Sequence, residues 1–116
     1  MSIVHKEFEW YKIADSVATL SFNENSLLEI SIAQKRICIS FHKEKLHAFS
    51  ATCPHAGGRL SCGYIDAMNN IVCPVHHYRF QLENGRNSSG EGYFLKVYPL
   101  QTRDDGLYIG LEKNNL

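Results

Sequence analysis

Two short segments, each with one cysteine and one histidine beside a proline, constrain this chain more than any other feature of its sequence. The first is Cys-Pro-His at residues 53–55, and the second is Cys-Pro-Val-His at residues 73–76. Neither segment has enough ligands to surround a metal ion by itself. Two thiolates and two imidazoles together make a four-ligand set, so we expect a fold that holds both segments around one metal centre.

The mixed content of each segment bears on which metal it binds. Common structural zinc sites take two cysteines from one loop and two histidines or cysteines from another. In this chain each loop supplies one of each kind, and seventeen residues (56–72) separate the first histidine from the second cysteine. The mixed loops argue against zinc, and a zinc-binding interaction module is therefore the weaker alternative.

This pattern, Cys-x-His followed by Cys-x-x-His, resembles the Rieske family, whose two-iron, two-sulfur (2Fe-2S) cluster has two cysteines on one iron and two histidines on the other. The resemblance implies one 2Fe-2S cofactor, with Cys53 and Cys73 on the inner iron and His55 and His76 on the outer iron. It extends to neighbouring positions, namely Pro54, Leu60, Gly63, Pro74 and Phe80.

The ligand set also raises the expected reduction potential above that of clusters held by four cysteines. Neutral imidazoles in place of two thiolates remove negative charge, so Rieske centres lie at about −150 to +300 mV, against about −400 mV for plant-type ferredoxins. In high-potential relatives a serine just after the last ligand, and a tyrosine further on, donate hydrogen bonds to the cluster. Here His77 and Tyr78 follow the ligand, and strand alternation predicts that Tyr78 points into the base. We therefore expect a potential in the lower part of the range.

Apolar residues recur with a period of two along most of the chain, which is typical of β-strands. We expect strands over residues 9–14, 28–32, 37–41, 46–51 and 78–82, a short strand at 71–72, and a closing hairpin of 94–101 with 107–111. The first hairpin, with its turn at Gln34-Lys35, is predicted to have one apolar face formed by Ile37, Ile39 and Phe41. No segment has the period of a helix. The pattern predicts an all-β fold, an antiparallel sandwich or partly open barrel.

The length of 116 residues is that of one domain. The resemblance implies that this single Rieske domain, residues 1–116, has a β base made of residues 1–46 and 86–112. A small cluster-binding subdomain at about 47–85 is inserted into that base. We expect the polar tail, 112–116, to be frayed.

Charge and hydropathy exclude several classes of partner. Twelve basic and twelve acidic residues balance, which argues against nucleic acid or an anionic membrane as the main partner. No apolar run approaches the roughly 20 residues needed to cross a bilayer, and the first residues have no signal-peptide core. We expect a cytoplasmic protein whose cysteines are reduced or bound to metal.

Several nearby residues are expected to have no ligand role. Cys38 is predicted to fill space within a strand, and Cys62 to be a free, buried thiol. Some high-potential Rieske proteins tie their ligand loops with a disulfide, but the corresponding positions here are Gly58 and Val75. Arg59 is expected to be solvated.

The resemblance is strongest to Rieske-type ferredoxins. A membrane helix and the disulfide mark the Rieske subunit of respiratory complexes, and a second iron domain marks oxygenase large subunits. The sequence predicts instead a monomeric one-electron carrier between a flavin-dependent reductase and a terminal oxygenase, with both imidazoles at an exposed tip. Such a protein is a component of an oxidoreductase system and is not an enzyme by itself. The main alternative is the small Rieske-like subunit of an assimilatory nitrite reductase.

Overall fold

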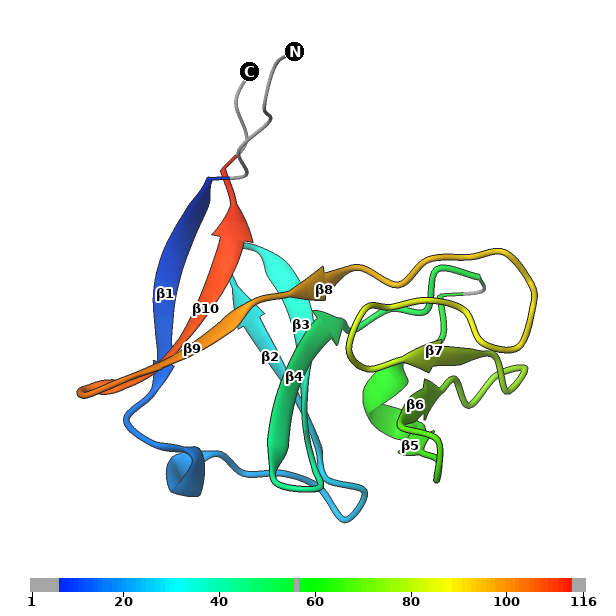
Figure 1. Ribbon diagram of the computed structural model, residues 1–116, viewed down its shortest axis with the longest axis horizontal. Helices are drawn as coiled ribbons and strands as arrows, with labels where there is room; N and C mark the ends of the chain where they lie inside the picture. Colours follow the sequence, from blue (N-terminus) through cyan, green and yellow to red (C-terminus); the bar gives the residue numbers. More distant parts are fainter. Residues whose placement is uncertain (1–6, 56, 114–116) are drawn as a thin grey trace.

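The computed structural model describes residues 7–55 and 57–113 as three antiparallel sheets (Figure 1). The first sheet contains β1 (Phe8–Ala14), β10 (Gly106–Glu112) and β9 (Leu100–Arg103), and the second contains β2 (Leu27–Ile32), β3 (Lys35–His42), β4 (Lys45–Ser50) and β8 (Val97–Tyr98). The third contains β5 (Tyr64–Ile65), β6 (Asn70–Val72) and β7 (Arg79–Gln81). The predicted all-β class is confirmed, as an open arrangement of sheets and not a closed barrel.

Helical structure in the described residues is limited to two single 3-10 turns, η1 (Val17–Thr19) and η2 (Leu60–Cys62). Neither turn could cross a membrane. The predicted frayed tail lies largely in residues 114–116, which are outside the described part of the chain.

Strands β2, β3 and β4 follow one another through two tight turns. Ala33 and Gln34 form the first turn with φ of 50° and 66°, which is the backbone of a primed hairpin turn. The predicted position of this turn is wrong by one residue, because Lys35 already belongs to β3 and pairs with Ile32.

The prediction that this hairpin has one apolar face is also wrong, because β3 is buried on both faces. Ile37 and Ile39 lie in one core with Ile109 of β10. Cys38 points the opposite way, into a second core that it shares with Phe49. Apolar alternation did not predict this second buried face, because position 38 is a cysteine and position 40 is a polar residue. The second sheet therefore separates two cores.

The third sheet occupies the chain between the two candidate ligand loops and extends just beyond them. Strands β5 and β6, the latter at the position of the predicted short strand, form a small hairpin between the loops. Its turn is held by Asp66, whose carboxylate accepts hydrogen bonds from the backbone N–H of Met68 at 2.9 Å and of Asn70 at 3.0 Å. Arg79 of β7 pairs with the same carboxylate at 3.1 Å, so all three strands are joined through one acid.

After β7 the chain returns to the base along a loop, residues 82–96. The predicted strand at 94–101 is in fact two short strands in different sheets. Tyr98, in β8, pairs with β4, whereas Leu100, in β9, pairs with β10. Pro99 stands between them, and its lack of an N–H suits this change of sheet.

The division into a base and an insert stays a prediction, and the strands bear on its edges. Strand β4 remains in a base sheet to Ser50, and β8 rejoins that sheet at Val97. The third sheet, from Tyr64 to Gln81, lies wholly within the range of about 47–85 assigned to the insert.

Gly85 lies near the start of the return loop, and we expect Gly85→Ala to destabilise the fold strongly. Its φ is 78°, and an added Cβ would lie 1.9 Å from the carbonyl oxygen of Leu95. Backbone strain and this clash together should lower the free energy of unfolding by about 3 kcal/mol. Gly90 is the matched control, because it has φ of 92° with nothing within 4 Å of the added atom. Gly90→Ala should cost only about 1 kcal/mol, and equal losses in urea titrations would contradict the steric argument.

Candidate metal centre

The structure brings the two predicted ligand segments together. The Nδ1 atoms of His55 and His76 lie 3.5 Å apart, and the ring centroids are 5.0 Å apart. An added Cβ on Gly58 of the first loop would lie 2.7 Å from the Sγ atom of Cys73 in the second. The loops are therefore in direct contact, and Gly58 lets the backbone approach the sulfur closely.

Both loops have the same backbone turn. The N–H of Cys53 donates to the carbonyl five residues further on at 2.8 Å, and the N–H of Cys73 does the same at 2.9 Å. Each cysteine carbonyl in turn accepts the N–H of the residue four positions on, Gly57 or His77, at 3.1 and 3.0 Å. That residue has positive φ in both loops, 70° for Gly57 and 60° for His77. Two copies of one turn thus begin at the two cysteines, with His55 two residues after Cys53 and His76 three residues after Cys73.

Burial divides the four candidate ligands by type. Cys53 and Cys73 are 2% and 1% exposed. His55 is half-buried, and His76 is exposed. Thiolates without a metal are unfavourable in a buried place, and a metal bound there would stabilise them. The arrangement therefore has sulfur ligands inside and nitrogen ligands at the surface.

An aromatic pair that the sequence did not reveal covers His55. The ring of Tyr78 stacks on the imidazole at a centroid distance of 4.0 Å and an interplanar angle of 25°. Tyr93 lies 5.3 Å from His55 and 5.9 Å from Tyr78. The prediction that Tyr78 points into the base is wrong, because β7 begins only at Arg79 and the left-handed turn at His77 breaks the alternation before it.

A carboxylate lies beside the same imidazole. Hydrogen bonds from Ser89 and from Asn87, the latter at 2.9 Å, lower the pKa of Glu91, and His55 lowers it further. Partial burial raises the pKa of Tyr78, and the Glu91 charge adds to this effect. Glu91 is therefore ionised at neutral pH, and its charge acts on Tyr78.

An ion pair joins the far end of the first loop to strand β2 of the base. Arg59 is exposed, as expected, and its Nε also lies 3.1 Å from Glu29 of β2, while Arg36 lies 2.9 Å from the same carboxylate. Burial raises the pKa of Glu29, but the two guanidinium groups outweigh it and hold that pKa below its usual value.

The predicted burial of Cys62 is wrong. Turn η2 buries Leu60 and leaves the Cys62 thiol exposed and free.

The donor set suits a centre of two metal ions. Within residues 7–55 and 57–113, no three cysteine, histidine, aspartate or glutamate side chains converge as ligands of a single ion would. The candidates instead form a buried thiol pair and a surface imidazole pair, which matches the two-and-two ligation of a Rieske 2Fe-2S cluster. A tetrahedral zinc ion needs at least three ligands around one point, so the residues present fit the cluster better.

Comparison with known proteins identifies the same family as the ligand pattern does. The family model described as the Rieske [2Fe-2S] domain matches residues 9–98. A Rieske domain-containing protein of Homo sapiens is 32% identical over 71 residues, or 59% of this chain and 42% of that protein. The ferredoxin component of the naphthalene 1,2-dioxygenase system of Pseudomonas aeruginosa is 26% identical over 101 residues, or 86% of this chain and 96% of that protein. The chain thus spans less than half of the human relative and nearly all of the bacterial one.

Solved structures show the same fold at low identity. A chain from the complex of reduced oxygenase and oxidized ferredoxin in carbazole 1,9a-dioxygenase has a TM-score of 0.74 at 20% identity, covering 92% of this chain and 97% of that chain. A structure described as an NADH-dependent nitrite reductase small subunit from Mycobacterium tuberculosis has a TM-score of 0.76 at 13% identity, covering 90% and 96%. At these identities the likeness concerns the fold alone.

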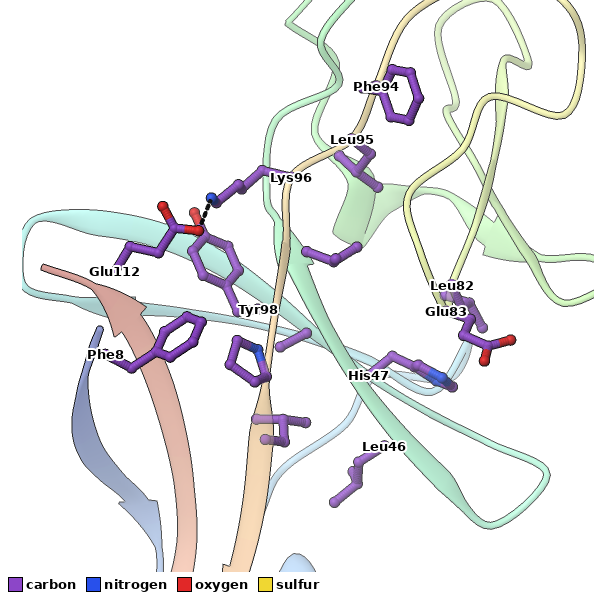
Figure 2. Close-up of a pocket in the computed structure, with 14 residues that line it drawn as sticks. Phe8, Leu46, His47, Leu82, Glu83, Phe94, Leu95, Lys96, Tyr98 and Glu112 are labelled. Atoms are coloured by element: carbon purple, nitrogen blue, oxygen red, sulfur yellow. Dashed lines mark ion pairs between the residues drawn. The ribbon is translucent and has the colours of Figure 1, made fainter. Parts of the chain in front are cut away.

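A groove of about 740 Å³ lies over β4, β8 and the return loop, with the ion pair of Lys96 and Glu112 along one side (Figure 2). None of the four candidate ligands lines it. His47 stands at its edge and also lines a smaller cavity of about 290 Å³ with His42 and Glu83. The Nδ1 of His47 is buried without a hydrogen-bond partner. This histidine thus lies where β4 meets the return loop, in a place that favours its neutral form.

His47 should make the fold sensitive to mild acid. Burial lowers its pKa below the ordinary 6.5; Glu83 opposes the shift, and Lys45 and His42 add to it. Because the folded-state pKa is the lower one, its stabilising contribution is present above about pH 6.5 and declines as the pH falls toward the lowered pKa. The free energy of unfolding should therefore fall more between about pH 7.5 and 5.5 in the native chain than in His47→Asn. Parallel pH profiles from urea titrations would contradict this assignment.

Proposed function

Because the chain belongs to the Rieske [2Fe-2S] domain family, we propose that it is a Rieske-type ferredoxin, a carrier of single electrons between redox proteins. One observation carries the proposal: two loops with the same pattern of backbone hydrogen bonds hold two buried cysteines and two imidazoles whose Nδ1 atoms lie 3.5 Å apart. No group positioned for bond-making catalysis is needed for this role, so the chain acts as a component of an oxidoreductase system.

Four residues of this chain would hold the cluster that the family carries. Cys53 and Cys73 would bind the inner iron, and His55 and His76 the outer iron. The bound cluster supplies reversible one-electron chemistry. The protein keeps water from the thiolates by burying them, and the matched turns fix the shape of each loop. The imidazoles at the surface provide the place where a partner can approach.

The proposed partners are a flavin-dependent reductase and a terminal oxygenase. The likeness to the naphthalene dioxygenase ferredoxin component along nearly its whole length supports this system. A similar chain occurs in the carbazole dioxygenase complex of oxygenase and ferredoxin. We further propose a cytoplasmic monomer made of one domain, with the cluster-binding part at about 47–85 inserted in the base.

A second candidate function is the small subunit of a nitrite reductase, which the TM-score of 0.76 with such a subunit favours. The two roles differ in how firmly the chain is held. A subunit forms a stable stoichiometric complex with a large haem-bearing partner that survives affinity purification. A carrier binds its partners in turn and purifies alone, which is the result that the present proposal requires.

Purified protein should be red-brown and contain about two irons and two inorganic sulfides per chain. It should give a rhombic electron paramagnetic resonance signal only after reduction by one electron. Cys53→Ser should lose the iron and the colour, whereas Cys62→Ser should keep both, because Cys62 is an exposed, free thiol. Iron and sulfide analysis with absorption spectra checks this. A colourless native protein that contains zinc would refute the ferredoxin assignment.

The reduction potential should fall in the lower part of the Rieske range, below about +100 mV. No serine follows the last candidate ligand His76, and the ring of Tyr78 stacks on His55. Fewer hydroxyl hydrogen bonds to the cluster leave its reduced form less stabilised. A redox titration followed by electron paramagnetic resonance measures the midpoint, and a value clearly above this limit would contradict the expectation.

A further inference from the structure

Three buried polar atoms without a hydrogen-bond partner lie together on one hairpin. Within residues 7–55 and 57–113, the buried side-chain atoms of this kind are the Oγ of Ser40, the Nε2 of His42 and the Nδ1 of His47. Ser40 pairs with His47 across strands β3 and β4, and His42 pairs with Lys45. Because side chains alternate along a strand, all four project from the same face of the hairpin. Most buried polar groups in proteins are hydrogen-bonded, so this concentration on one face indicates a site for a ligand.

The same face lines a cavity of about 290 Å³. The lining consists of four residues of the hairpin, two of the turn between β5 and β6, and three at and after the end of β7, namely His42, Lys43, Lys45, His47, 68–69 and 81–83. None of the four candidate cluster ligands is among them. The volume is close to the lower limit of cavities that hold small molecules, so a ligand here is small and lies between the second and third sheets.

Positive charge at this cavity is not neutralised by ion pairs. Lys43 and Lys45 are exposed and form no ion pair within the described part of the chain, whereas five other basic side chains pair with carboxylates at 2.8 to 3.1 Å. Glu83 is the one carboxylate among the lining residues, and it lies beside His47 where β4 meets the return loop (Figure 2). Two ammonium groups and one carboxylate leave a net positive charge, which favours an anion.

The donor types also favour an anion over a metal ion. A metal ion held by a protein site of this kind needs at least three ligands from histidine, cysteine, aspartate or glutamate, and no such group occurs in the residues that the structure describes. Ammonium groups, side-chain amides and imidazole N–H groups are instead hydrogen-bond donors. Asn69 and Gln81 add two amides to the lining. An oxyanion accepts several such bonds at once, and charged donors make them stronger.

We propose that this cavity is a binding site for a small oxyanion of the phosphate class, held between the β3–β4 hairpin and the third sheet. Lys43 and Lys45 supply the charge, and His42 and His47 supply further N–H donors. The site goes beyond the proposed electron-carrier function and uses none of the cluster ligands. A bound anion contacts two sheets at once, so it stabilises the folded chain.

Inorganic phosphate tests the site directly. Urea unfolding of the cluster-loaded chain is compared in phosphate and in chloride at equal ionic strength, and calorimetric titration gives the dissociation constant. Phosphate should raise the urea midpoint, because a ligand of the folded state stabilises that state. Lys45→Met should weaken phosphate binding by about tenfold, since it removes a charged donor.

Lys35→Met is the matched control for Lys45→Met. Lys35 is also exposed and without an ion pair within residues 7–55 and 57–113, and it begins β3, at the opposite end of that strand from His42. Its substitution makes the same change in net charge and should alter phosphate binding by less than about twofold. Equal losses in the two variants, or a midpoint that is the same in phosphate and in chloride, would overturn the proposal.

Glu83→Gln separates an anion site from a cation site. Loss of this carboxylate removes repulsion and should tighten phosphate binding by about threefold. At a cation site the same change weakens binding. Zinc chloride is therefore titrated into the native chain and into Glu83→Gln, and a zinc-dependent rise of the midpoint that is lost in Glu83→Gln would overturn the anion assignment.

The imidazoles and the source of the phosphate group are tested in the same way. His42→Asn and His47→Asn should each weaken phosphate binding by about threefold, with the midpoint in chloride as the reference for any change in stability. Glycerol 3-phosphate that binds more tightly than inorganic phosphate identifies a small phosphomonoester as the ligand, and the reverse order identifies the free ion. A phosphoserine peptide that binds when both small anions do not would overturn the proposal in favour of a protein partner.

Discussion

The close contact between the two ligand loops is the constraint on which the rest of the structure depends. Neither loop has enough donors alone, so the site exists only if the loops meet in a fixed register. Their matched backbone turns set the shape of each loop, and Gly58 allows one loop to lie against the sulfur of the other. The base then anchors the first loop, because the N–H of Ala51, where the loop begins, donates to the carbonyl of Arg36 in β3 at 3.1 Å. Local turns thus define the ligands, and the sheets define how the ligands meet.

The central strand β3 links the base to the site. Cys38 and Phe49 on one face of its sheet share a core with Leu60 of η2, Ile71 of β6 and Phe80 of β7. The opposite face packs against β10 in a separate core. Because Cys53 and Cys73 belong to the first core, the two candidate sulfur ligands are part of the packing that joins the third sheet to the second. Burial raises the pKa of the Cys38 thiol to about 12, so this residue stays a neutral packing group and does not compete with the ligands.

The sequence alone predicted the features of the fold and the candidate site that depend on local chemistry. Ligand spacing identified the candidate centre, and apolar alternation located most strands, since both signals lie within a few residues. Contacts between segments that are far apart in the sequence could not be predicted from it. Nothing near Tyr93 indicates that its ring meets His55, and the pairing of Arg59 with Glu29 joins residues thirty positions apart. Tyr78 was misplaced for a different reason: the positive φ of His77 ends the alternation, and a non-glycine residue in that conformation is hard to anticipate.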